Sequence, residues 1–175
     1  NSAGTTWSDK TLVFSPVVLM PGGIATYPGL QLWLGADTGV SDTAWADQSG
    51  NGNDATKHGS PTLTAGALNG LPVMRYSGAN GEYHSFSNMN NIRTVFWVTK
   101  RAANNYSFIL GDNNQYHFHT NTNLFFHTSH VSPNVVNGAL AVNGTATNGQ
   151  TTNVPSVMSV ISLRTTGYVE ASSFS

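Results

Sequence analysis

Short apolar runs separated by turn-forming dipeptides dominate this chain and limit what it can fold into. Asn51-Gly52, Asn69-Gly70 and Asn143-Gly144 tolerate positive φ, and each lies beside a run of apolar or β-branched residues. No segment of helical length shows an apolar repeat of 3.6 residues. The pattern therefore predicts an antiparallel all-β protein.

The apolar runs give the expected strands and core. The strands are predicted at Leu30–Leu34, Val73–Tyr76, Tyr83–Phe86, Arg93–Lys100, Ser107–Leu110, Gln115–His119, Leu124–His127, Gly138–Val142, Val157–Leu163 and Tyr168–Ser172. The most apolar runs belong in the centre of a sheet, so Val95, Trp97, Val160 and Ile161 are predicted core residues. A tight hairpin turn is predicted at Val142–Thr145.

Composition excludes several classes of partner. Only 9% of the residues are charged and the net charge is −1, with seven scattered Lys and Arg residues, so no nucleic-acid footprint exists. The chain has no cysteine, which excludes disulfides and thiolate metal sites. The longest apolar run, Leu12–Met20, is interrupted by Ser15 and Pro16 and is too short to span a bilayer. The start at Asn1, without a Met or a signal-like run, suggests a processed segment, and we expect an extracellular or cell-surface location.

One motif carries a family resemblance. The segment WADQSGNGNDAT presents a W-x-D-x-S-G-N-G-N core, and it lies between GLQLWLGADTGV and LNGLPVMRYSGANGEY. The core residues are Trp45, Asp47, Ser49, Gly50, Asn51, Gly52 and Asn53. Their order resembles the laminin-G-like branch of the concanavalin A-like lectin/glucanase superfamily. The resemblance implies a two-sheet antiparallel jelly-roll sandwich that serves in recognition or adhesion more often than in catalysis.

The same resemblance suggests a domain organisation. Residues 1–23 are expected to be a linker or an N-terminal strand extension, and residues 24–175 the β-sandwich domain. Members of the superfamily continue past the position of Ser175 with another inward-facing strand. The resemblance thus predicts a sandwich that lacks its last strand, which a longer chain or a neighbouring chain or domain would supply.

Acidic residues give little support for catalysis. A glucanase of this fold needs two carboxylates that face the glycosidic bond. Glu82 and Glu170 are the only glutamates, they are far apart in sequence, and the Glu-x-Asp-x-x-Glu motif of laminarinase-type glucanases is absent. We therefore predict no catalytic residues and no enzyme activity.

The motif turn offers oxygen atoms at alternate positions. Asp47 and Asp54, with Asn51 and Asn53, are the raw material of a calcium loop, although the distal bidentate glutamate of such loops is missing. Side chains of this type also bond the backbone of their own turn. The self-bonded turn is the favoured interpretation, and calcium as a cofactor is the alternative.

Histidines concentrate in one region. Tyr116 is followed by four histidines, His117, His119, His127 and His130. A hairpin near residues 121–123 would place His127 beside His117 and His119. An ordinary solvated hairpin, with Phe118 and Phe125 or Phe126 turned inward, is the favoured interpretation. The alternatives are a glycan or ligand contact through these five residues and a transition-metal site.

These observations predict a non-catalytic recognition or adhesion module of a larger secreted or cell-surface protein, with a glycan or another surface ligand as its partner. The first alternative is a structural subunit or spacer of a filament, appendage or virion that assembles through strand-edge contacts. The second alternative is a polysaccharide-degrading enzyme. No nucleic acid and no membrane span are expected.

Overall fold

A computed structural model describes residues 29–79, 81–101, 108–112, 117–120 and 123–175. The predicted 1–23 segment, Tyr116 and parts of two predicted strands lie outside these ranges. The elements are β1 (Ala44–Trp45), β2 (Ala55–His58), β3 (Thr62–Leu68), β4 (Leu71–Arg75), β5 (Tyr83–Thr99), α1 (Pro133–Val136), β6 (Ala139–Val142), β7 (Thr145–Thr147) and β8 (Ser159–Phe174). The prediction of an antiparallel all-β protein is confirmed.

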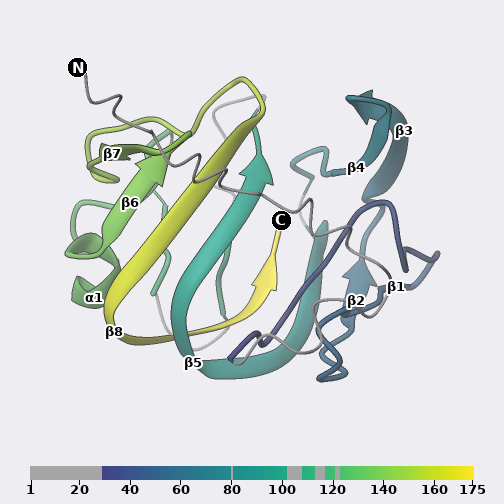
Figure 1. The fold of residues 1–175 in the computed structure, drawn as a ribbon, viewed down its shortest axis with the longest axis horizontal. Helices are drawn as coiled ribbons and strands as arrows, with labels where there is room; N and C mark the ends of the chain where they lie inside the picture. Colours follow the sequence, from purple (N-terminus) through teal and green to yellow (C-terminus); the bar gives the residue numbers. More distant parts are fainter. Residues whose placement is uncertain (1–28, 80, 102–107, 113–116, 121–122) are drawn as a thin grey trace, which may run out of the picture.

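The strands form one large sheet and one hairpin (Figure 1). The large sheet has six strands in the order β1-β2-β5-β8-β6-β7, and β3 pairs only with β4. Every strand pair is antiparallel. No helix in the described ranges has the length and apolar character needed to cross a bilayer.

Two hairpins confirm the turn signals. Asn69 and Gly70 have φ of 50° and 79° and join β3 to β4, while Asn143 and Gly144 have the same two values and join β6 to β7. Both residues of each pair thus have the positive φ that a two-residue hairpin turn of type I′ requires. The predicted turn at Val142–Thr145 is confirmed by the pairing of these two residues.

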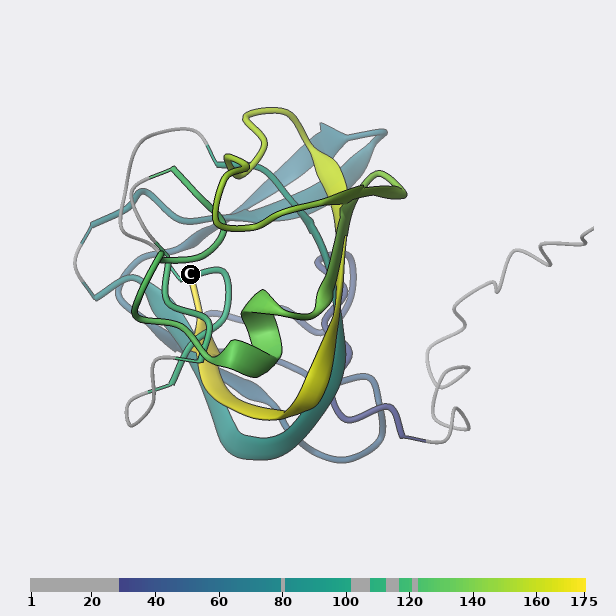
Figure 2. The same cartoon turned by 90° about the vertical axis from the view of Figure 1, so that its left-hand side faces the viewer.

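Two long strands replace four predicted short ones. Tyr83–Phe86 lies within β5 and Arg93–Lys100 overlaps its end, while Val157–Leu163 and Tyr168–Ser172 overlap β8. The pairing of β5 with β8 shifts register at three places between Ser85 and Thr94. Such irregularities bend strands and increase their twist. Figure 2 shows the result: β5 and β8 are strongly curved, and α1 lies inside the curve.

Several predicted strands are not formed. Residues 30–34, 108–110, 117–119 and 124–127 are irregular, and Leu124 makes only an isolated bridge to Asn153. Their apolar side chains still enter the core: Phe118, Phe125 and Phe126 are buried. The apolar pattern therefore indicated burial correctly but not the hydrogen-bonding partner.

The core prediction is right for some positions and wrong for one. Ile161 is fully buried, and Val95 and Trp97 pack against the core. Val160 is 50% exposed, because successive side chains of a strand point to opposite faces and Ile161 takes the inner one. A single helical turn, α1, was not predicted; the Ser132 side chain caps it and Pro133 occupies its first turn.

Candidate functional site

The motif turn is held by one carboxylate. Asp47 Oδ1 accepts the N–H groups of Trp33 and Ser49, both at 2.9 Å. Its Oδ2 accepts the Ser49 hydroxyl at 2.6 Å and the Asn53 N–H at 3.1 Å. Burial raises the pKa of Asp47, but the hydrogen bonds from Ser49, Trp33 and Asn53 outweigh it and hold the pKa below its ordinary value. Asp47 therefore connects two segments that are distant in sequence.

The remaining motif residues complete this connection. The Nδ2 groups of Asn51 and Asn53 donate to the carbonyls of Leu30 and Gln31 at 2.7 and 2.8 Å, respectively. Asp54 Oδ1 accepts the Asp47 N–H at 2.8 Å. In this arrangement the two asparagines present donors to the backbone, and Asp47 uses both of its oxygens in hydrogen bonds. The turn thus has the self-bonded hydrogen bonds that the first interpretation described, and the calcium alternative stays a prediction.

The predicted histidine group divides into two parts. His117 lies beside Asp112 and Glu170, whereas His119, His127 and His130 gather together. The reason is that residues 117–119 form no strand, so His117 and His119 do not share a sheet face. Tyr116 lies outside the described residues.

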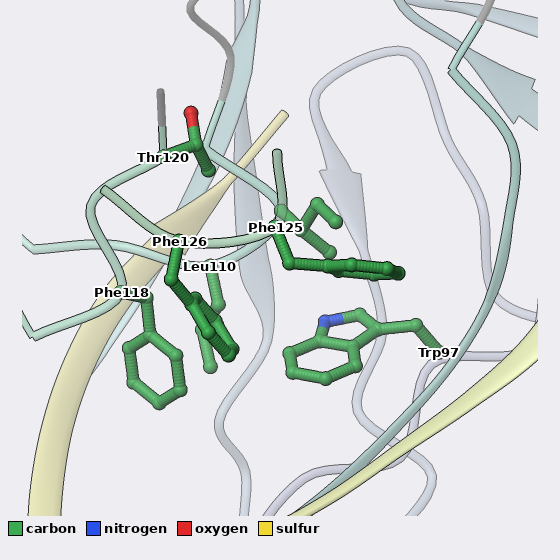
Figure 3. A pocket seen from close by; sticks show the side chains of 7 residues that line it. Trp97, Leu110, Phe118, Thr120, Phe125 and Phe126 are labelled. Carbon is green, nitrogen blue, oxygen red and sulfur yellow. The ribbon is translucent and has the colours of Figure 1, made fainter. Parts of the chain in front are cut away.

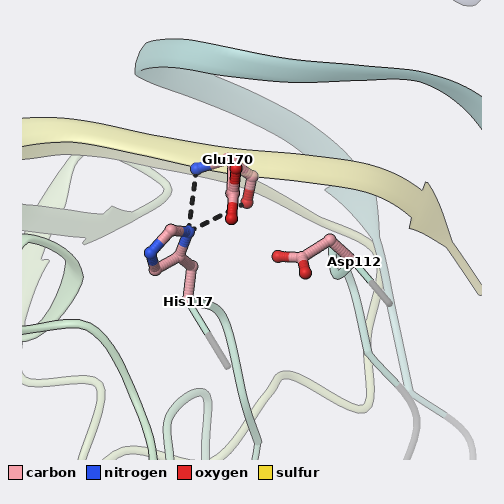
Figure 4. A group of neighbouring side chains, drawn as sticks. All are labelled: Asp112, His117 and Glu170. Carbon is pink, nitrogen blue, oxygen red and sulfur yellow. Dashed lines mark hydrogen bonds between the residues drawn. The ribbon is translucent and has the colours of Figure 1, made fainter. Parts of the chain in front are cut away.

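Asp112, His117 and Glu170 form a mixed group of one imidazole and two carboxylates (Figure 4). One ligand atom from each lies within 4.8 Å of those of the other two, and all three residues are half-buried. Glu170 comes from β8, and its Oε2 accepts a hydrogen bond from Asn88 Nδ2 at 3.3 Å. No local sequence pattern indicates this group, because Asp112 and Glu170 are brought together only by tertiary pairing.

Backbone hydrogen bonds attach the 108–112 segment to β8. Gly111 bridges Ser173 of β8, with its N–H 2.8 Å from the Ser173 carbonyl and its own carbonyl 2.9 Å from the Ser173 N–H. His117 adds a side-chain bond to the same strand: its Nδ1 accepts the Glu170 N–H at 2.9 Å. The 108–112 segment and the imidazole of His117 therefore bind the edge of β8 that β6 does not reach.

The two glutamates have different surroundings. Glu82 Oε2 accepts the N–H of Ser77 at 2.5 Å and its hydroxyl at 2.8 Å, which gives it a role in a turn. Glu170 has Asp112 as a carboxylate neighbour. Asp112 and Glu170 are therefore a neighbouring pair of acids that the sequence did not reveal.

The second histidine group consists of His119, His127 and His130. The rings of His127 and His130 have centroids 4.7 Å apart, and the ring of His119 lies 5.2 Å from that of His127. Burial lowers the pKa of His119, and the positive charges that His127 and His130 can carry lower it further. His127 Nδ1 accepts the N–H groups of Ser129 and His130 at 3.0 and 3.1 Å, so this nitrogen already stabilises a turn.

An aromatic cavity lies next to the core (Figure 3). Its volume is about 10 Å³, close to the minimum that holds one water molecule. It is lined by Trp97, Ile109, Leu110, Phe118, Thr120, Phe125 and Phe126. This space is a packing defect rather than a site for an organic ligand.

The face of the large sheet that points away from the core is exposed and partly apolar. We call it the outer face and define it by Phe96, Val98 and Val160, which are 69%, 63% and 50% exposed. Phe96 pairs with Ser162 and Val98 with Val160, so these side chains lie next to each other across β5 and β8. Ile161 and Leu163, which alternate with Val160 and Ser162 along β8, are fully buried on the other side of the sheet.

Polar and aromatic groups continue the outer face along the strands. Thr94 pairs with Arg164, next to Phe96 and Ser162. The guanidinium of Arg93 lies 5.6 Å from the centre of the exposed Tyr168 ring, which is within the range of a cation–π contact.

Comparison of the chain with protein-family models, with curated proteins and with solved structures yields no match.

Proposed function

We propose that the chain is a non-catalytic recognition module of a larger secreted or cell-surface protein, and that it binds a glycan or another surface ligand through its outer face. The observation that supports this best is the exposure of Phe96 together with Val98 and Val160. Contiguous exposed apolar residues with a polar surround are typical of interaction sites on soluble domains.

The chemistry of the outer face suits a neutral polar ligand with apolar edges. The ring of Phe96 offers a flat apolar surface, and Ser162 and Arg164 supply a hydroxyl and a guanidinium on neighbouring positions. A sugar presents C–H groups on the faces of its ring and hydroxyls at its edge. With only 9% charged residues in the chain, such contacts fit better than an ionic partner.

The fold proposal goes with the functional one. The WADQSGNGNDAT motif resembles the laminin-G-like branch of the concanavalin A-like superfamily, in which recognition modules are common. The large antiparallel sheet, curved around the core, is compatible with one half of a jelly-roll sandwich. Fold alone does not fix function, so the proposal rests on the outer face.

The test is a glycan array followed by calorimetry on the selected glycan. Phe96→Ala is expected to weaken binding at least tenfold, because the flat apolar contact is lost. Leu71→Ala is the matched control, since Leu71 is a 55% exposed apolar residue of the separate β3–β4 hairpin. Equal affinity of the Phe96→Ala variant and the wild type would contradict the proposal.

Two other outcomes correspond to the alternative functions. A concentration-dependent assembly that Phe96→Ala dissolves, without glycan binding, would favour a structural subunit. Release of reducing ends from a polysaccharide, abolished by Glu170→Gln, would favour a degrading enzyme. The neighbouring carboxylates of Asp112 and Glu170 are the observation behind that last alternative.

A further inference from the structure

We propose that Asp112, His117 and Glu170 bind a divalent first-row transition-metal ion, with Zn²⁺ as the experimental probe. The three side chains come from two segments that are distant in sequence and meet at the edge of β8 (Figure 4). This site is separate from the outer face, so the inference does not depend on the proposed function.

The donor set and its spacing suit such an ion. An imidazole favours zinc, copper, iron or nickel, and two carboxylates balance a double positive charge. Zinc bonds of about 2.1 Å in a tetrahedron place the ligand atoms about 3.4 Å apart. The observed ligand atoms lie within 4.8 Å of one another, so small side-chain rotations would close the site. The open fourth position would be filled by water or by a ligand.

The backbone holds the ligands in place. Glu170 belongs to β8, which pairs with β5 on both sides of it through Val169 and Ala171. Asp112 follows Gly111, whose N–H and carbonyl both bond to Ser173. The carbonyl of His117 accepts the Ser132 N–H at 3.1 Å. A site mounted on paired backbone loses less entropy on binding than one on free loops.

The carboxylates also gain from a cation. Their oxygens lie within 4.8 Å of each other, so an ion placed between them would have two carboxylate ligands. The chain contains only eight acidic residues, so a close pair is not the result of an acid-rich surface. A divalent ion between Asp112 and Glu170 would be attracted to both carboxylates.

The imidazole presents one ring nitrogen to the site. His117 Nδ1 lies 2.9 Å from the Glu170 backbone nitrogen and 3.4 Å from the Glu170 carbonyl oxygen. In Figure 4 this same nitrogen is on the side of the ring that faces the two carboxylates. Metal binding at Nδ1 would exchange the contact with the Glu170 N–H for a metal bond. The Glu170 amide is therefore a direct reporter of occupancy.

The test is a Zn²⁺ titration of the metal-free full chain in competition with a chromophoric chelator. We expect saturable binding with one ion per chain, and at least a tenfold loss of affinity in Asp112→Asn and in Glu170→Gln. These variants keep size and shape, and thermal unfolding checks that they are folded. The matched control is His127→Ala, which removes a histidine of the second group and should leave the affinity unchanged.

A second readout locates the ion. In an amide NMR spectrum, Zn²⁺ should shift the resonance of the residue 170 amide in the wild type and in His127→Ala, but not in Glu170→Gln at the same Zn²⁺ concentration. Affinity that survives both carboxylate variants, or that disappears in His127→Ala, would overturn the proposal and assign the ion to the second histidine group. Absence of saturable binding up to about 1 mM Zn²⁺ would also overturn it.

Discussion

Replacement of Tyr76 and His84 together by phenylalanine is expected to remove about 2 kcal/mol of the acid sensitivity of this fold between pH 7 and 5. His84 is 1% exposed and stacks on Phe174 with ring centroids 5.5 Å apart. Its Nδ1 lies 2.7 Å from the Tyr76 hydroxyl. Burial, together with the positive charges of Lys57 and His58, lowers the pKa of His84 to about 4.

The sign and size follow from linkage. The folded-state pKa of His84 is lower than the value of about 6.5 in the unfolded chain, so the unfolded chain binds the proton more tightly. The free energy of unfolding is therefore highest above pH 6.5 and decreases as the pH falls toward the folded pKa. Two-state proton binding with these two values gives a loss of about 2 kcal/mol between pH 7 and 5.

Urea unfolding at pH 5, 6 and 7, followed by tryptophan fluorescence, measures this loss. The wild type should lose about 2 kcal/mol more than the double variant over this range. The single variant Tyr76→Phe keeps the imidazole and should keep the pH dependence. The reasoning is refuted if the double variant and the wild type lose the same free energy between pH 7 and 5.

Three further changes have defined expectations, each measured as the change in the free energy of unfolding in urea. Asp47→Ala leaves four donors without their acceptor and should lower the free energy of unfolding by about 3 kcal/mol. In the wild type, the stability that the Asp47 carboxylate contributes should be lost only as the pH falls below about 3.9. Gly138→Ala would place its Cβ 2.6 Å from the Arg164 carbonyl and should cost about 2 kcal/mol or more, and a neutral result would contradict this contact. Ser132→Ala removes the cap of α1 and should cost about 1 kcal/mol, whereas Ser132→Asp should restore it.

The features that the sequence predicted are those that depend on a few adjacent residues. Asn69-Gly70 and Asn143-Gly144 specify their hairpins because positive φ is a property of the residue pair itself. The all-β class follows from the same local signals. A run of apolar residues does not reveal which of its members face the core, since strand alternation exposes Val160 and buries Ile161.

The features that the sequence did not predict depend on distant partners. Whether an apolar segment such as 124–127 becomes a strand is decided by the backbone groups that happen to lie beside it, and here an isolated bridge to Asn153 is all that forms. The same holds for the metal candidate. Asp112 and His117 have no motif in common with Glu170, and their meeting depends on the bridge between Gly111 and Ser173.

The edge of β8 explains why this bridge and the candidate metal site occur at the same place. β6 pairs with β8 only from Ile161 to Arg164, so the strand beyond needs other partners for its N–H and carbonyl groups. The 108–112 segment bonds to the last residues of β8, and the His117 ring accepts the N–H of Glu170. The His117 side chain supplies the hydrogen-bond acceptor that a neighbouring strand would otherwise supply. An ion that binds His117 Nδ1 must compete with that role, so occupancy of the site and the order of this strand edge are coupled, and the exchange rate of the Glu170 amide hydrogen should rise when Zn²⁺ is bound.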